Sequence, residues 1–134
     1  MKIKKISIIG LGYIGLPTAA VFASKKIKVV GVDIGEKIVN TINKGKIHIV
    51  ENDLESLVRK VVKQGFLRAT TKSEPADVFF ITVPTPFKGK KFQPDLSFVM
   101  NACKSISPNL KKGNLVVLES TSPVGTTEKI SNWL

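Results

Sequence analysis

The chain has 134 residues, and its content of 43% hydrophobic and 23% charged residues is typical of a single globular domain. Its 21 basic and 10 acidic residues give a net charge of +11, but the lysines are dispersed from Lys2 to Lys129, which indicates a solvated surface and not a nucleic-acid interface. A single cysteine excludes an internal disulfide and favours a reducing, cytoplasmic location.

A strand, a tight turn and a helix are predicted over residues 5–24. The strand KISII stops at Gly10, and the spacing Gly10-x-Gly12-x-x-Gly15 then opens the helix. Gly10 permits the turn, Gly12 lets a pyrophosphate approach the backbone, and Gly15 lets the helix pack close to the strand. The free N–H groups at the start of such a helix favour an anion. The motif therefore predicts a phosphate-binding loop.

The uncharged stretch of 19 residues, 6–24, is also long enough to suggest a membrane span or a secretory signal. Its three glycines and Pro17 make it a poor isolated helix, and a second strand follows it, so neither alternative is favoured. The apolar positions of the predicted helix include Ile14, Val21 and Phe22. We therefore expect a short helix of a globular domain and no membrane partner.

The next predicted strand, residues 27–32, ends at Asp33. This acid lies 18 residues after Gly15, where the ribose-binding carboxylate of a dinucleotide site belongs. A carboxylate accepts hydrogen bonds from both ribose hydroxyls but repels a 2′-phosphate, and no arginine follows it to offset that repulsion. The predicted cofactor is therefore NAD and not NADP.

Two helices are predicted after Asp33. The first, within residues 35–45, places Ile38 and Ile42 inward and stops at Gly45. The second lies within residues 52–65.

That second helix begins with capping-box spacing, with Asn52 as the cap and Glu55 three residues later. An apolar stripe follows, which indicates core packing and not a binding face. Its residues are Leu54, Leu57, Val58, Val61 and Val62, and the helix is closed by Gly65.

Two further strands are predicted at residues 67–70 and 76–84, the second too continuously apolar for a surface strand. A loop with three prolines follows, and Asp95 then caps a helix. One face of that helix carries Leu96, Val99, Cys103 and Ile106. A last buried strand, a turn rich in serine and threonine, and the start of a helix are predicted from residue 115 onward.

The alternation of strands and helices predicts an α/β fold, a Rossmann-like doubly wound parallel sheet with helices on both faces that forms one NAD-binding domain over residues 1–134. In such sheets ligands bind beyond the carboxyl ends of the strands. Polar residues follow three of those ends, in residues 10–15, 82–86 and 120–127. The hydroxyl groups expected to converge there belong to Thr85, Thr121, Ser122 and Thr126, although turn formation and helix capping explain each of them equally well.

We find no convincing candidate in the sequence for a residue that takes part in hydride transfer. His48, in the apolar string IHIV, is expected to be packed or on the surface, and Cys103 is expected to be an inert buried thiol. The last predicted element is a helix, whereas a six-stranded dinucleotide domain needs a further strand. The sequence thus predicts the cofactor-binding part of a larger enzyme, with no metal site.

Several motifs together resemble the amino-terminal domain of the UDP-glucose/GDP-mannose dehydrogenase family: GLGYIGLPTA, INKGKIHIVENDL, VPTPF, PDLSFV and ESTSPVGTTEK. The resemblance implies an enzyme that oxidises the C6 alcohol of a sugar nucleotide twice, with two NAD, through an aldehyde and a cysteine thioester. The implied substrate is UDP-N-acetyl-D-mannosamine, with UDP-N-acetylglucosamine and UDP-glucose as alternatives. The product would be an aminouronic acid for bacterial surface polysaccharides.

The same resemblance implies roles for individual residues. NAD contacts fall on Tyr13 and Ile14 of the glycine loop, on Asp33, and on Thr85 and Thr126. Thr121 matches a threonine near the reacting centre that helps to place water.

The catalytic cysteine and lysine of the family fall beyond residue 134, so these residues alone are expected to be inactive, and the full-length enzyme is expected to be a homo-oligomer. Two other functions remain as alternatives: a stand-alone NAD-sensing module and a basic nucleic-acid-binding domain.

Overall fold

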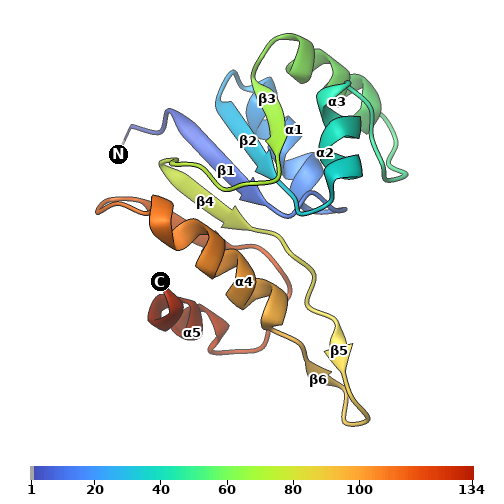
Figure 1. Ribbon diagram of the computed structural model, residues 1–134. Helices are drawn as coiled ribbons and strands as arrows, with labels where there is room; N and C mark the ends of the chain where they lie inside the picture. Colours follow the sequence, from blue (N-terminus) through green and yellow to red (C-terminus); the bar gives the residue numbers. More distant parts are fainter. Residues whose placement is uncertain (1) are drawn as a thin grey trace.

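A computed structural model describes residues 2–134 (Figure 1). The principal strands are β1 (Lys5–Ile9), β2 (Lys28–Val32), β3 (Leu67–Thr70), β4 (Val78–Ile81) and β7 (Leu115–Leu118). The helices are α1 (Gly15–Ser24), α2 (Glu36–Asn43), α3 (Leu54–Lys63), α4 (Ser97–Ile106), the short 3₁₀ turn η1 (Ser107–Asn109) and α5 (Thr126–Trp133). A small hairpin, β5 (Phe87–Lys88) and β6 (Gln93–Pro94), extends from the loop after β4.

The principal strands form one parallel sheet in the order β3-β2-β1-β4-β7. The chain builds outward from β1 through β2 to β3, then crosses back to add β4 and β7 on the other side. Strand order therefore reverses between β1 and β4, which is where ligands bind in open α/β sheets. The predicted Rossmann-like, doubly wound fold is confirmed.

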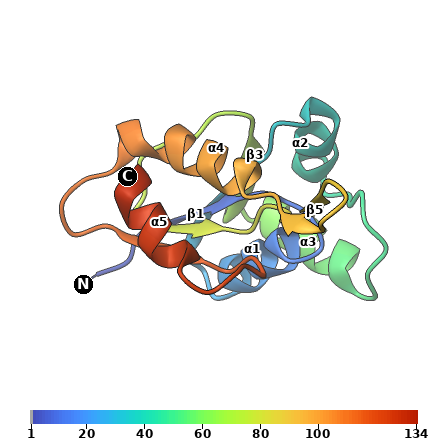
Figure 2. The ribbon, with the colours of Figure 1, turned by 90° about the horizontal axis from the view of Figure 1, so that it is seen from below.

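Helices cover both faces of the sheet, with α1 and α3 on one side and α4 on the other (Figure 2). The β-branched strands are buried on both faces, which explains why their sequences are continuously apolar. One core joins the sheet to α1, α2 and α3 through residues such as Ile8, Ala19, Ile42, Val58 and Leu67. The other joins it to α4 and α5 through Phe79, Ile81, Val99, Cys103 and Ile130.

Two of the three apolar residues expected on α1 do not face the core. The buried residues of the helix are Gly15, Leu16 and three alanines, whereas Ile14 and Val21 are 54% and 53% exposed. Phe22 is half-buried and its ring packs near Phe80, with centroids 5.3 Å apart. Small side chains let the helix axis approach the sheet closely, so the large residues were displaced to the outer face.

The predicted capping box of α3 is also wrong. The residue before the helix is Asp53, which has a left-handed backbone (φ +61°), and it makes no side-chain capping hydrogen bond. This left-handed residue moves Asn52 out of register with the N–H groups of the first turn. The apolar stripe is confirmed, because Leu54, Val58 and Val61 are buried and the other two residues pack against them.

The predicted end of α2 is confirmed. Gly45 follows α2 with a φ of +73°, the left-handed conformation of a helix stop, and Ile42 is buried, while Ile38 is half-buried. Asp95 does not cap α4 as predicted: the N-cap is Leu96, which has no side-chain capping hydrogen bond, and Asp95 Oδ1 instead accepts the Ser97 N–H at 2.9 Å in a turn that leads into the helix.

Strand β7 is less buried than predicted. Leu115 is 48% exposed and the rest of the strand is half-buried. Within residues 2–134, β7 pairs only with β4, so it forms an edge of the sheet. None of the helices described over those residues is long and apolar enough to cross a bilayer.

Candidate cofactor-binding site

Four loops meet at the carboxyl edge of the sheet. They follow β1, β2, β4 and β7, and because these strands are parallel neighbours, their carboxyl ends lie side by side. The glycine loop after β1 and the loop after β4 flank the point where strand order reverses. The predicted site residues therefore come from segments far apart in the sequence.

The glycine loop is held so tightly that two of its positions leave no room for a side chain. Gly10 has a φ of +98°, and an added Cβ would lie 2.9 Å from the Thr82 carbonyl oxygen. At Gly15 an added Cβ would lie 1.7 Å from the Gly10 carbonyl oxygen and 2.6 Å from the Thr82 hydroxyl. These two glycines are therefore required by the fold itself.

Gly12 has different surroundings. An added Cβ there would have no atom within 4 Å, so packing within the chain does not demand glycine. The neighbouring Tyr13 and Ile14 are exposed, and their backbone N–H groups donate to no acceptor in residues 2–134. Helix α1 begins here, with the Leu16 N–H donating to the Gly12 carbonyl at 3.1 Å. An open glycine beside free N–H groups at a helix start suits a phosphate.

Asp33 joins the glycine loop to the start of α2. Its Oδ2 accepts the Leu11 N–H at 2.9 Å, and its Oδ1 accepts the Gly35 N–H at 2.9 Å. Its own N–H donates to the Thr70 carbonyl at 3.1 Å, which ties it to β3. Each carboxylate oxygen keeps further acceptor capacity, which is what a pair of ribose hydroxyls requires.

Thr82 is a residue whose importance the sequence did not reveal. It is buried at the end of β4, and its hydroxyl lies 2.9 Å from the Ile9 carbonyl oxygen and 2.7 Å from that of Gly10. This hydroxyl secures the glycine loop from the neighbouring strand. A threonine ending a buried strand was the available signal, but its partner depends on β4 lying next to β1.

The hydroxyl groups after β4 and β7 converge only in part. Thr85 Oγ1 donates to the Thr121 carbonyl at 2.5 Å, and Ser120 Oγ donates to the Val83 carbonyl at 2.6 Å, so the two loops are joined. Thr126 is buried, and its hydroxyl donates to the Pro123 carbonyl at 2.7 Å, within its own turn. Turn formation therefore accounts for the position of the Thr126 hydroxyl, because the N-cap of α5 is Gly125 and the helix has no side-chain capping hydrogen bond.

A contact between α1 and the loop after β7 also closes this edge. Thr18 Oγ1 donates to Glu119 Oε1 at 3.2 Å. The sequence did not predict this contact, because the two residues lie 101 positions apart.

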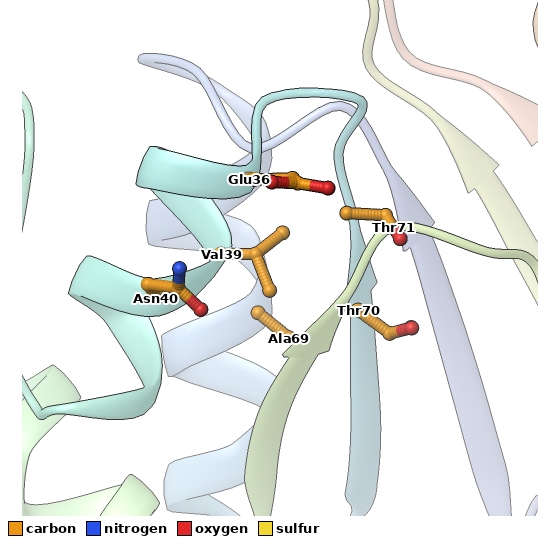
Figure 3. A pocket seen from close by; sticks show the side chains of 6 residues that line it. All are labelled: Glu36, Val39, Asn40, Ala69, Thr70 and Thr71. Atoms are coloured by element: carbon orange, nitrogen blue, oxygen red, sulfur yellow. The ribbon is translucent and has the colours of Figure 1, made fainter.

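A pocket of about 350 Å³ lies beside this site, between the start of α2 and the end of β3 (Figure 3). Glu36 and Thr71 face each other across it, with Val39 and Asn40 below them. By strand order the pocket is on the far side of β2 from the glycine loop. None of the predicted site residues lines it.

His48 and Cys103 lie outside the site. His48 is exposed on the segment between α2 and α3. Cys103 is fully buried in α4, as predicted, and burial raises the pKa of its thiol. Over residues 2–134 no three His, Cys, Asp or Glu side chains are grouped closely enough to hold a metal ion.

Comparisons with known proteins agree with this geometry. The model of the UDP-glucose/GDP-mannose dehydrogenase family, NAD binding domain, matches residues 4–134. The chain is 64% identical over 130 residues to a UDP-N-acetyl-D-mannosamine dehydrogenase from Campylobacter jejuni, covering 97% of the chain and 32% of that relative. It is 63% identical over 131 residues to an NDP-N-acetyl-D-galactosaminuronic acid dehydrogenase from Ralstonia nicotianae, covering 98% of the chain and 31% of that relative.

Solved structures give the same result. A UDP-N-acetyl-mannosamine dehydrogenase from S. aureus superposes with a TM-score of 0.92 at 40% identity, over 96% of this chain and 31% of that one. The chain therefore spans about a third of the length of the relatives it matches.

Proposed function

This chain belongs to the UDP-glucose/GDP-mannose dehydrogenase family, whose NAD-binding domain matches it over residues 4–134, and we propose that it forms the amino-terminal cofactor-binding part of a longer nucleotide-sugar 6-dehydrogenase. The observation that carries this proposal is the open space at Gly12 beside the anchored Asp33 carboxylate. When bound, NAD supplies the hydride acceptor for the oxidation of an alcohol. The remainder of the enzyme would supply the nucleophile.

The proposed cofactor contacts begin in the glycine loop. The pyrophosphate would lie over Gly12, against the free N–H groups of Tyr13 and Ile14. Gly10 and Gly15 would act by shaping that loop, and Asp33 would accept hydrogen bonds from the adenosine ribose.

Beyond the glycine loop, the proposed cofactor contacts are Thr85 and Thr126. Thr121 would help to place water near the reacting centre. Support for the last assignment comes from the hydrogen bond of Thr85 to the Thr121 carbonyl, which puts both residues at the same end of the crevice.

The substrate of the whole enzyme is proposed to be UDP-N-acetyl-D-mannosamine, oxidised to the carboxylate in two NAD-dependent steps. The names of the two relatives at 64% and 63% identity differ in their sugar, but one names an N-acetylated hexosamine and the other an N-acetylated hexosaminuronic acid. This favours a nucleotide-activated N-acetylhexosamine over the alternative UDP-glucose. We further propose a cytoplasmic location and a homo-oligomeric full-length enzyme. A stand-alone NAD-sensing module is the second candidate.

Calorimetric titration of the chain with NAD, and separately with NADP, tests the cofactor site. We expect saturable binding that prefers NAD, because the Asp33 carboxylate repels a 2′-phosphate. Asp33→Ala should weaken NAD binding by at least about tenfold, since a hydrogen bond to a charged group is worth about 1.5–3 kcal/mol.

The matched control is Glu51→Ala, which removes an exposed carboxylate outside the site and should leave NAD binding unchanged. Circular dichroism establishes that each variant is folded. A folded chain that binds neither dinucleotide, or an Asp33→Ala variant that binds NAD as well as the original, would contradict the proposal.

A further inference from the structure

The lysines that are dispersed along the sequence gather at one edge of the folded chain. Because the five principal strands are parallel, the segments that lead into them all lie at the amino edge of the sheet, opposite the cofactor site. Eight exposed lysines occupy these segments, and we name them the amino-edge lysines. They are Lys2 and Lys4 before β1, Lys25, Lys26 and Lys28 at the entry to β2, Lys63 before β3, and Lys111 and Lys112 before β7.

Two more basic residues lie at this edge and are paired with an acid. Lys5 Nζ donates to Glu74 Oε2 at 2.9 Å, and Arg68 forms a two-pronged ion pair with the same carboxylate. The other acid at this edge is Asp77, whose Oδ2 accepts the backbone N–H groups of Lys4 and Lys5 at 2.8 and 2.9 Å. These two carboxylates offset only a small part of the positive charge at the amino edge.

The net charge is thus strongly polarised. The amino edge carries ten basic and two acidic side chains, a difference of +8 out of the total of +11. The remaining 11 basic and eight acidic side chains contribute +3. Those eight acids lie toward the carboxyl edge or at the starts of helices that begin there: Asp33, Glu36, Glu51, Asp53, Glu55, Asp95, Glu119 and Glu128.

The residue types at the amino edge indicate which polyanionic partner it suits, a nucleic acid or another anionic surface. The cations at this edge that lack an acidic partner in the described residues are all lysines, whereas its single arginine is occupied by Glu74. One of these lysines, Lys28, donates to the Gly65 carbonyl at 2.9 Å and lies over the half-buried Phe66 ring. The large side chains exposed at this edge are aliphatic: Ile3, at 44%, between Lys2 and Lys4, and Leu115, at 48%, beside Lys111 and Lys112. Nucleic-acid surfaces favour arginine forks and exposed aromatic rings, which this edge does not offer.

We propose that the amino edge is a peripheral contact surface for a membrane that carries anionic phospholipids. Clustered lysines are attracted to such a surface within a Debye length of it, and the two aliphatic side chains would reach the headgroup region. The expectation of no membrane partner rested on the glycines and Pro17 of residues 6–24, which argue against a membrane-spanning helix and do not bear on peripheral contact. In this orientation the cofactor site at the opposite edge faces the aqueous phase and stays open to its ligands (Figure 1).

Co-sedimentation with phospholipid vesicles tests this inference. We expect the chain to bind phosphatidylcholine vesicles that contain phosphatidylglycerol, to ignore vesicles of phosphatidylcholine alone, and to dissociate in about 0.5 M salt. The test variant is Lys25→Glu/Lys26→Glu/Lys111→Glu/Lys112→Glu. The control variant, Lys72→Glu/Lys88→Glu/Lys90→Glu/Lys91→Glu, makes the same change in net charge at exposed lysines that follow the carboxyl ends of β3 and β4.

The test variant should lose about tenfold or more in affinity for anionic vesicles, while the control should lose much less. Thermal melting of both variants, and NAD titration of the test variant, separate loss of contact from loss of fold. Equal losses in the two variants would show that only total charge matters and would overturn the proposal. Failure of the original chain to bind anionic vesicles would overturn it too, as would equal or tighter binding to duplex DNA at the same salt concentration.

Discussion

The glycines at positions 12 and 15 lie on the same loop in different surroundings. Gly15 packs against the Gly10 carbonyl and the Thr82 hydroxyl, where a Cβ would overlap backbone atoms. Gly12 faces open space, and its φ is not in the left-handed region that favours glycine. Gly15 is therefore required by the fold, and Gly12 leaves space for a ligand.

These surroundings predict opposite effects for the same substitution. Gly15→Ala should destabilise the domain by about 3 kcal/mol or more, since neither the backbone nor the buried hydroxyl can move aside easily. Gly12→Ala should change the free energy of unfolding by no more than about 0.5 kcal/mol, yet weaken NAD binding severely. Denaturant unfolding and NAD titration of both variants provide the measurements. A Gly12→Ala variant that binds NAD normally would show that the pyrophosphate lies elsewhere.

Single residues could be predicted from the sequence where the proposed role follows from neighbours along the chain. Asp33 was located by its spacing from Gly15, and its anchoring by the Leu11 and Gly35 amides agrees with a fixed carboxylate. Thr82 was not singled out, because its role depends on a strand that is 73 residues away in sequence.

At the scale of elements, Glu74 links the segment that connects β3 and β4 to strands β1 and β3 through side-chain hydrogen bonds. It bonds to Lys5 at the start of β1 and to Arg68 in β3. The Arg68 hydrogen bond, followed by the Lys5 hydrogen bond and both charges, lowers the pKa of Glu74 from 4.5 to about 2. The folded state thus favours the ionised form.

A group whose pKa is lower in the folded state adds stability that is full above its unfolded pKa and is lost as pH falls through its folded pKa. Glu74→Gln should therefore reduce the free energy of unfolding by about 1 kcal/mol at pH 7, a modest value because the pair is partly exposed. The difference from the original chain should shrink between pH 4.5 and about 2. Urea unfolding across that range checks this, with Glu51→Gln as the control. A difference that does not vary with pH would contradict the ion-pair explanation.

Elements were predicted more reliably than their faces and ends. The periodicity of α3 located its core stripe, but its capping box failed because Asp53 is left-handed. In α1 the large apolar residues suggested the wrong face, because close approach to the sheet selects alanine over isoleucine and valine. Hydrophobicity alone does not specify how near a helix lies to its sheet.

At the scale of the whole molecule, residues 1–134 as an isolated polypeptide should bind NAD without oxidising UDP-N-acetyl-D-mannosamine. Cys103 is fully buried and His48 lies away from the crevice, so neither can act as the nucleophile of a thioester mechanism. Absorbance at 340 nm, with NAD and the UDP-sugar present, should stay at the level of the buffer. Steady formation of NADH by the purified chain would show that this part carries its own catalytic group.

The sequence by itself determined the α/β class and the NAD-binding family, and it predicted the phosphate loop and the ribose acid, because each depends on local periodicity or on short, fixed spacing. Tertiary structure alone decided that β4 lies beside β1, and with it the Thr82 bond to the glycine loop and the meeting of Thr85 with Thr121. It also decided that lysines spread along the chain collect at one edge, opposite the cofactor site. The physical reason is the same in both cases: strand order is fixed by long-range packing, and parallel pairing then places all strand entries on one side and all strand exits on the other.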